Sequence, residues 1–174
     1  VLIANDDNDT KVAKKIAKAF VDNPDVLGVI GHFSSEVTLA AAEVYQENQL
    51  VVISPTSTSV TISRLGNYVF RTIPSDRFFG SALSRYMLNQ LNVRKAAVFF
   101  NSRSNYSQSL ADAFTTALFA DGGEVVAEFD FAKPNFNAGV DVKQAIDNGA
   151  EVLILAPNSA TLNQALLVVQ VNDG

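Results

Sequence analysis

The sequence predicts an α/β fold built on parallel sheets, and three observations support this prediction. Short apolar runs alternate with helical patterns almost without a break along the 174 residues. The apolar runs hold few polar residues, which is typical of parallel strands covered on both faces. Strands that alternate with helices form right-handed βαβ units. Pro74 then interrupts the strand pattern before a new helical pattern starts, so we expect two parts, residues 1–75 and 76–174.

The first part contains apolar runs separated by two helical patterns. Val12, Ile16 and Phe20 are spaced four apart, as on one face of a helix. Asp9 or Thr10 would cap the start of this helix. The expected helices are 12–20 and 36–46, the expected strands are 1–4, 26–30, 50–53 and 68–73, and a loop rich in Ser and Thr spans 54–63.

The second part repeats the same plan. Leu110, Phe114 and Leu118 are the inward residues of one helix, which Gly122 and Gly123 would end. The expected helices are 78–87, 106–120, 140–148 and 162–169, and the expected strands are 96–100, 124–129 and 151–155.

Composition excludes several classes of function. Thirteen Lys and Arg against 18 Asp and Glu give a net charge of −5. Nucleic-acid affinity depends on Lys and Arg contacts with phosphate, so we expect no nucleic-acid partner. There is no cysteine, which excludes disulfides and thiolate chemistry. No apolar run approaches the ~18 residues of a membrane-spanning helix, so we expect no membrane insertion of this segment. The chain opens on Val1 without a signal peptide, and we expect a fragment or a processed product.

Small polar residues follow the carboxyl end of nearly every expected strand. Ligands of open α/β sheets bind at these ends. The segments concerned are 5–7, 31–35, 54–58, 101–106 and 156–159. Their hydroxyl, amide and backbone N–H groups would hold a small polar ligand by hydrogen bonds without carrying out chemistry on it.

Each candidate in these segments also has a structural explanation. Ser34 and Ser35 stand where a helix begins, and the helix dipole favours an anion there. We favour an N-cap role for Ser34, whereas cap and anion-binding roles stay equally open for Ser35. Thr56 and Thr58 would face one side of an extended loop, although a turn that satisfies its own backbone explains them better on pattern alone. Tyr106 could cover a ligand, but a half-buried packing role is again favoured.

The remaining polar residues give no sign of an enzyme. His32, the only histidine, lies beside Ser34, but no Gly-x-Ser-x-Gly elbow is present, so a structural histidine is favoured. Asp6, Asp7 and Asp9 lack the spacing of a calcium loop, which favours an acidic, helix-capping turn. Nucleotide, phosphate and zinc motifs are absent. We therefore expect no catalytic residue, no metal and no cofactor.

Five segments, taken in order, resemble a known family. They are Asp6-Asp7, Val29-Ile30-Gly31-His32-Phe33-Ser34-Ser35, Ile53-Ser54-Pro55-Thr56-Ser57-Thr58, Phe70-Arg71-Thr72 and Asn105-Tyr106-Ser107. Together they look like the branched-chain amino acid (Leu/Ile/Val) binding proteins of ABC transporters. These are type I periplasmic binding proteins, which are similar also to the ligand-binding domains of extracellular receptors.

The resemblance implies two Rossmann-like, flavodoxin-like lobes of parallel sheet flanked by helices, with a ligand in the cleft between them. Residues 1–75 would be part of lobe one and residues 76–174 part of lobe two. The chain would then be a partial one that covers roughly the middle of the fold.

The resemblance also implies roles for individual residues. Ser35 would bind the ligand carboxylate, the carbonyl of Thr56 would accept from the ligand ammonium, and Thr58 would contact the amino-acid backbone. Tyr106 would cover the ligand from lobe two. Asn158 falls at a position that is often aromatic in the family, which favours a polar or amide-bearing amino acid over leucine.

The sequence thus predicts a binding protein and not an enzyme. We expect a periplasmic or extracellular solute-binding protein that captures a small amino acid or amide and delivers it to an ABC permease. Closure about a hinge would trap the ligand. The first alternative is the ligand-sensing domain of an extracellular receptor or kinase, and the second is a flavodoxin-like α/β enzyme.

Overall fold

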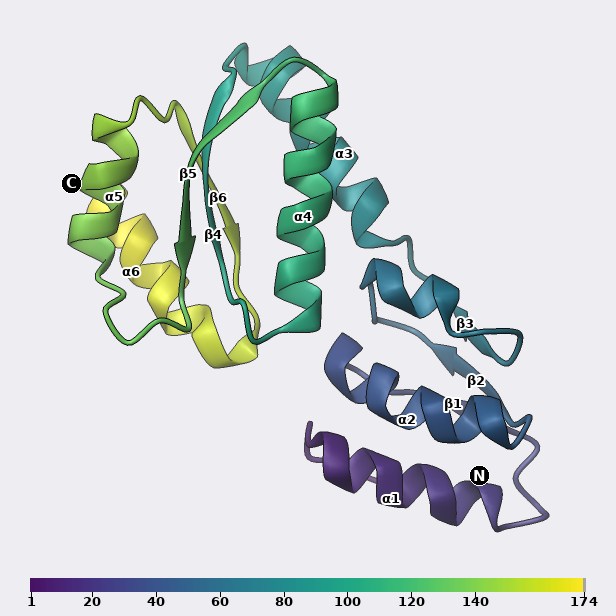
Figure 1. Ribbon diagram of the computed structural model, residues 1–174. Helices are drawn as coiled ribbons and strands as arrows, with labels where there is room; N and C mark the ends of the chain where they lie inside the picture. Colours follow the sequence, from purple (N-terminus) through teal and green to yellow (C-terminus); the bar gives the residue numbers. More distant parts are fainter. Residues whose placement is uncertain (174) are drawn as a thin grey trace. The chain divides into compact units, whose positions relative to one another are not determined.

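The computed structural model describes residues 1–173, which form two units with a parallel sheet in each (Figure 1). One unit spans Val1–Ser75, and the other starts at Asp76. The strand order is β1-β2-β3 in the first unit and β5-β4-β6 in the second, and all neighbouring strands run parallel. The α/β class with parallel sheets is therefore confirmed.

The first unit follows the predicted order from its first helix onward. Asp9 caps this helix, because its Oδ1 accepts hydrogen bonds from the backbone N–H groups of Lys11 and Val12 at 2.7 and 3.0 Å. The elements are α1 (Thr10–Val21), β1 (Gly28–Ile30), α2 (Ser35–Glu47), β2 (Val51–Ser54), a 3₁₀ turn (Val60–Arg64) and β3 (Val69–Arg71).

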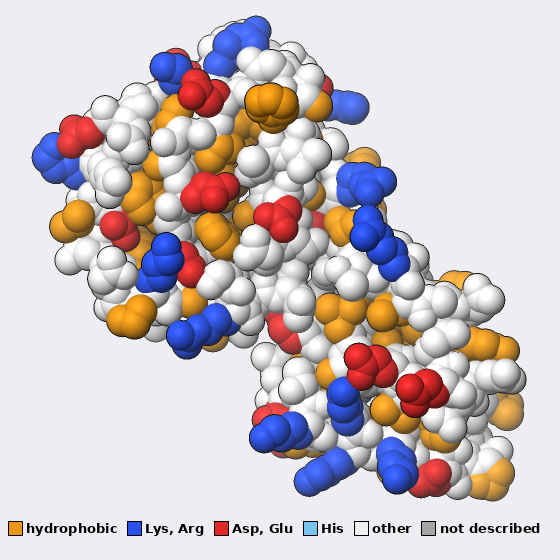
Figure 2. All heavy atoms as spheres, in the orientation of Figure 1, with side chains coloured by type: hydrophobic (Ala, Val, Ile, Leu, Met, Phe, Trp, Pro, Cys, Tyr) orange, Lys and Arg blue, Asp and Glu red, His pale blue; other side chains and the backbone are white. Residues whose placement is uncertain are grey.

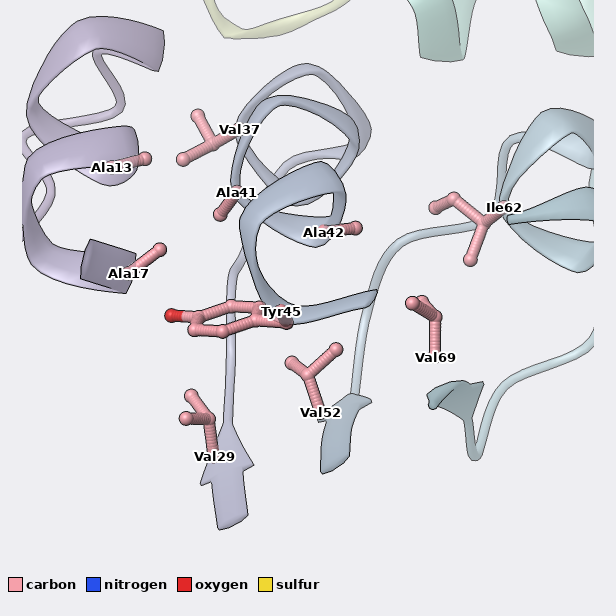
Figure 3. Packing of buried hydrophobic residues seen from close by; sticks show 10 residues of the cluster. All are labelled: Ala13, Ala17, Val29, Val37, Ala41, Ala42, Tyr45, Val52, Ile62 and Val69. Carbon is pink, nitrogen blue, oxygen red and sulfur yellow. The ribbon is translucent and has the colours of Figure 1, made fainter. Parts of the chain in front are cut away.

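The core of the first unit lies between the sheet and its two helices. Val29, Val52 and Val69 point from the three strands toward the helices, and Tyr45 of α2 lies over Val29 and Val52 (Figure 3). Ala13 and Ala17 are fully buried on α1, where their small side chains let the two helices approach closely.

On the opposite face of this sheet, no described element covers the apolar side chains. The sequence predicted strands that are covered on both faces. Ile30 pairs in register with Ile53, and Ile53 pairs with Phe70. These three side chains are 84%, 36% and 51% exposed. An apolar strand composition shows that a face is suited to burial, but it does not reveal what covers that face.

The predicted strand over 1–4 is wrong, because residues 1–6 form no strand in the structure. A strand needs a neighbour to which its backbone can donate and from which it can accept. Residues 1–6 and the residues of β1 instead line an open space of about 910 Å³. Strand β1 is consequently hydrogen-bonded only to β2 within the described chain.

The second unit has helices on both faces of its sheet (Figure 1). Helices α5 and α6 cover one face, where Phe99 and Phe129 stack with ring centroids 4.7 Å apart. Helix α4 covers the other face through Phe114 and Leu118. The elements are α3 (Asp76–Tyr86), a wider helical turn (Met87–Leu91), β4 (Lys95–Phe100), α4 (Asn105–Ala120), β5 (Glu124–Asp130), α5 (Ala138–Asp147), β6 (Val152–Ala156), a 3₁₀ turn (Ser159–Thr161) and α6 (Leu162–Asn172).

The described helices and the face drawn in Figure 2 bear on whether the chain has a membrane span or a basic patch. None of the described helices is both long and apolar enough to cross a bilayer. On the face drawn in Figure 2, acidic and basic side chains are interspersed.

Helices α3 and α4 pack so closely at Gly80 that no side chain fits there. A Cβ atom at this position would lie 2.5 Å from the backbone nitrogen of Phe114 and 2.6 Å from the carbonyl carbon of Ala113. Because both atoms belong to backbone, they cannot move aside without shifting α4.

The substitution Gly80→Ala is expected to lower the free energy of unfolding by roughly 1–3 kcal/mol, because α4 must move to admit the methyl group. Gly139→Ala in the first turn of α5 is the matched control, since its Cβ would meet only Asn137 Oδ1 at 3.5 Å. The control should be neutral or slightly stabilising, because Ala favours helix over Gly. Urea denaturation of both variants provides the test, and equal stabilities would contradict the close packing.

Candidate functional site

The carboxyl ends of β1 and β2 meet the start of α2 in a group of hydroxyl side chains. We call this group the hydroxyl cluster. Its members are Ser35, Thr38, Ser54, Thr56, Ser57 and Thr58. All but Thr56 are buried, so their hydroxyl groups need partners within the protein or from a ligand.

Two backbone carbonyl groups after β1 hold most of the cluster together. The oxygen of His32 accepts a hydrogen bond from Ser54 Oγ at 3.0 Å. The oxygen of Phe33 accepts from Thr56 Oγ1 at 2.6 Å. Ser57 Oγ and Thr38 Oγ1 lie 2.7 Å apart and are hydrogen-bonded to each other. These bonds fix the loop after β2 (residues 55–59, here called the β2 loop) to the turn that enters α2.

Ser34 occupies the N-cap position of α2 as expected, but the expected interaction is wrong. Its side chain makes no cap hydrogen bond, and its Oγ donates to Asn8 Oδ1 at 2.5 Å instead. The first N–H groups of a helix have no partner inside the helix. Because the Ser34 side chain accepts no hydrogen bond from these N–H groups, the N-terminus of α2 can still bind an anionic group.

Ser35 is the first residue of α2 and is only 2% exposed. Its Oγ accepts a hydrogen bond from the backbone N–H of Ser59 at 3.2 Å. A hydroxyl that accepts in this way still has its own proton to donate. Ser35 therefore links the two loops and retains a donor beside the helix N-terminus.

Thr58 is the unusual member of the cluster. Its side chain is 8% exposed, and its Oγ1 has no hydrogen-bond partner among the described residues. Leaving a buried hydroxyl unpaired costs roughly 1–3 kcal/mol. The hydroxyl of Thr56, in contrast, is used on Phe33, so a ligand role for Thr56 would fall to its backbone carbonyl.

The locally satisfied turn that pattern alone favoured is wrong for both threonines. The local bond in this loop runs from the backbone N–H of Ser57 to Ser54 Oγ at 3.2 Å. Neither Thr56 Oγ1 nor Thr58 Oγ1 takes part in it.

Arg71 holds the β2 loop in place, a role that the sequence pattern did not predict. Its Nη1 donates to the carbonyls of Thr58 and Ser59 at 3.0 and 2.8 Å, and its Nη2 donates to Ser63 Oγ. A lone charged residue at the end of the apolar strand β3 is the sequence signal that could have pointed to it.

The acidic turn before α1 serves structure, as favoured from the sequence. Asp9 caps α1, and Asp7 Oδ1 accepts from Asn5 Nδ2 at 2.6 Å. Asp6 Oδ2 lies 2.6 Å from His32 Nδ1. His32 is thus a hydrogen-bonded, buried residue. Within the described residues, no cluster of three or more His, Asp or Glu side chains is arranged to hold a metal ion.

In the second unit, the two candidate residues follow the neighbouring strands β4 and β6. Tyr106 is half-buried in the first turn of α4. Burial, followed by the negative charge of Asp76, raises the pKa of the Tyr106 phenol. Tyr106 therefore stays a hydrogen-bond donor at neutral pH.

Asn158 is tied into the strand ends by its amide oxygen. This Oδ1 accepts from Asn101 Nδ2 at 3.1 Å and from Thr161 Oγ1 at 2.9 Å. These bonds give the Asn158 side chain a fixed orientation.

Asp130, at the end of β5, is hydrogen-bonded to the loop that precedes α4. It accepts from Ser102 Oγ at 2.6 Å, from Ser102 N at 3.0 Å and from Ala132 N at 2.9 Å. Burial alone would raise the pKa of Asp130, but these hydrogen bonds outweigh it and lower the pKa. No local pattern in the sequence distinguishes this aspartate, because its main partner lies 28 residues away.

The lowered pKa of Asp130 predicts a pH-dependent contribution to stability. A carboxylate whose pKa is lower in the folded state stabilises the fold above its unfolded pKa, and the effect disappears as the pH falls through the folded value. The difference in melting temperature between wild type and Asp130→Asn should therefore be constant above about pH 5 and shrink as the pH falls below about 4. Asp147→Asn is the control, because the exposed pair of Asp147 with Lys143 contributes little. A difference that is constant with pH would contradict the assignment.

The structure thus brings Ser35, Thr56 and Thr58 together in the first unit. It places Tyr106 and Asn158 after two adjacent strands of the second unit.

Comparisons with known proteins agree with this picture. A family model described as "Periplasmic binding protein" matches residues 1–170. The chain is 35% identical over 153 residues to an "Amino acid binding protein" of Pseudomonas aeruginosa, a match that covers 86% of this chain and 40% of the relative. It is 34% identical over 113 residues to "Leu/Ile/Val-binding protein homolog 1" of Brucella abortus, covering 64% of this chain and 30% of that protein.

Solved structures show the same fold. An ABC transporter substrate-binding protein from Desulfitobacterium hafniense, solved in complex with Leu, matches with a TM-score of 0.84 and 28% identity. The match covers 99% of this chain and 51% of that structure. The chain therefore spans about half the length of the proteins it resembles, or less. With nearly every residue matched by the family model, the chain belongs to the periplasmic binding protein family.

Proposed function

We propose that this chain is part of an extracytoplasmic solute-binding protein that captures a small amino acid or amide for an ABC permease. The two units would correspond to parts of lobe one and lobe two, with residues 1–75 in the first and 76–174 in the second. The relatives support an amino-acid ligand, because one is an amino acid binding protein and another was solved in complex with Leu.

The observation that carries the proposal is the unpaired hydroxyl of Thr58. A protein gains stability by giving a buried hydroxyl a partner or by replacing it with a methyl group. The Thr58 hydroxyl has no hydrogen-bond partner among the described residues, and the residue is not a valine. The other hydroxyls of the cluster are hydrogen-bonded. A polar ligand that accepts from or donates to Oγ1 would explain why the side chain is polar.

The chemistry around Thr58 fits the charged backbone of an amino acid. The N-terminus of α2 and the Ser35 hydroxyl together would attract the ligand carboxylate. The backbone carbonyl of Thr56 would accept a hydrogen bond from the ligand ammonium. Hydroxyls and carbonyls of this kind bind a zwitterion without reacting with it.

We further propose that Tyr106 and Asn158 contribute to the same ligand from the second unit. Tyr106 would cover the ligand with its ring. Asn158 would offer its Nδ2 group, which suits an oxygen of a polar or amide side chain. A polar or amide-bearing amino acid is therefore the proposed ligand class, in preference to leucine.

A binding role also fits the state of the one histidine. His32 is engaged on both ring nitrogens, by Asp6 and by Tyr45, so it is not placed to act as a general base for a serine. The relatives named above are binding proteins as well.

A calorimetric screen of the full-length protein against the standard amino acids tests the proposal. We expect saturable binding of a polar or amide-bearing amino acid and weaker binding of leucine. A ligand at 100 times its Kd should stabilise the folded protein by about 2.7 kcal/mol in a thermal melt. Failure of every amino acid to bind would overturn the proposed function, and tight binding of leucine alone would overturn the ligand class.

Thr58→Val separates ligand binding from stability. The variant keeps the shape of the side chain and removes an unpaired hydroxyl, so the free energy of unfolding should rise by roughly 1 kcal/mol. Ligand affinity should fall, because a hydrogen bond to a charged group contributes about 1.5–3 kcal/mol. That loss corresponds to a Kd about 10- to 150-fold higher.

Thr115→Val on α4 is the matched control for this experiment. Thr115 Oγ1 also lacks a hydrogen-bond partner among the described residues, but it lies outside the hydroxyl cluster. Its replacement should stabilise the protein without changing the Kd. Equal affinities of wild type and Thr58→Val would show that Thr58 does not contact the ligand.

A further inference from the structure

His32 lies at the centre of a partly buried series of hydrogen bonds that includes Asp6 and Tyr45. The residue is 7% exposed. Its Nδ1 is 2.6 Å from Asp6 Oδ2, and its Nε2 is 3.2 Å from the hydroxyl of Tyr45. The planes of the imidazole and the Tyr45 ring are inclined by 25°, with centroids 6.0 Å apart. Both ring nitrogens therefore have partners within the protein.

The Asp6 carboxylate determines the direction of one of these two hydrogen bonds. Burial, and then the negative charge of Asp6, raises the pKa of Tyr45 far above its ordinary value, so the phenol keeps its proton. The Tyr45 hydroxyl can donate to Nε2 or accept from it. The Asp6 carboxylate accepts the proton carried by Nδ1. The three side chains thus form a series of hydrogen bonds from Tyr45 through His32 to Asp6.

The backbone of the same residue carries the binding loops. The His32 carbonyl accepts from Ser54 Oγ at 3.0 Å and from Thr38 Oγ1 at 3.4 Å. The next carbonyl, that of Phe33, accepts from Thr56 Oγ1 at 2.6 Å. A rotation of the His32 backbone would therefore move the β2 loop that contains Thr56 and Thr58.

We propose that His32 is a positioning residue of the amino-acid site, held by Asp6 and Tyr45 so that the carbonyls of His32 and Phe33 keep the Thr56–Thr58 loop in its binding geometry. The inference rests on the proposed function and assigns a role that involves no contact between His32 and the ligand. Asp6, 26 residues earlier in the chain, thereby acts on ligand affinity from outside the hydroxyl cluster.

Asp6→Asn tests this link, because the amide is a weaker acceptor for Nδ1–H and has no charge. We expect the Kd of the full-length protein for its amino acid to rise about tenfold, because groups in one hydrogen-bonded network are energetically coupled. Asp7→Asn is the matched control, since it makes the same charge change one residue away, where Asp7 pairs with the exposed Asn5. Its Kd should equal that of the wild type.

A purely structural role would lower stability without lowering affinity. Val52→Ala, a fully buried core position of the same unit, serves as the control for stability. It should lower the melting temperature at least as much as Asp6→Asn does, and its Kd measured well below melting should be unchanged. His32→Asn tests the same link from the other side, since Asn cannot contact both Asp6 and Tyr45.

A spectroscopic readout tests the hydrogen-bonded chain without any ligand. His32 is the only histidine of these 174 residues, and comparison with His32→Asn identifies its ring-nitrogen signals in the NMR spectrum. We expect a proton on Nδ1, and the signals should change in Asp6→Asn but not in Asp7→Asn. An Nδ1 without a proton would overturn the inference.

The outcomes separate this inference from the proposed function. Binding by the wild type that Asp6→Asn and His32→Asn both retain overturns the inference alone. Failure of the wild type to bind any amino acid overturns the proposed function, and the positioning role falls with it. Weakened binding in Asp6→Asn, with Asp7→Asn and Val52→Ala unchanged, supports both.

Discussion

The short turn between β1 and α2 is the constraint on which the polar site of the first unit depends. Where β1 ends, its backbone leaves the sheet, and the carbonyls of His32 and Phe33 need new partners. Hydroxyl groups of Ser54 and Thr56 provide them. A shortage of backbone partners at the strand end thus explains why this region is rich in Ser and Thr. The same bonds place Ser35 and Thr58 beside the start of α2.

The side chain of Thr58 makes the first unit less stable than it could be. Thr58 is buried with an unpaired hydroxyl, although valine would fit the same space. Arg71 donates to the backbone carbonyl of this residue, which holds the loop in place. Unsatisfied buried groups of this kind are expected at sites where function, and not stability, determines the side chain.

The parts of the fold that could be predicted from sequence are those with local causes. The spacing of Val12, Ile16 and Phe20, and the cap at Asp9, are sufficient to place α1. The cap role of Ser34 and the strand over 1–4 were wrong because each depends on a partner distant in sequence. Ser34 bonds to Asn8, and residues 1–6 have no strand beside them. The roles of Arg71 and Asp130 were missed for the same reason, since their hydrogen-bond partners are 8 to 28 residues away.

The central claim is that the start of α2 and the β2 loop bind the charged backbone of an amino acid. An NMR titration that follows backbone amide signals of the full-length protein tests it most directly. The account predicts that the amides of Ser35, Glu36 and Thr58 shift on addition of the amino acid and reach saturation at the Kd found by calorimetry. Saturable binding that leaves these amides unchanged, and shifts signals only elsewhere in the chain, would contradict it.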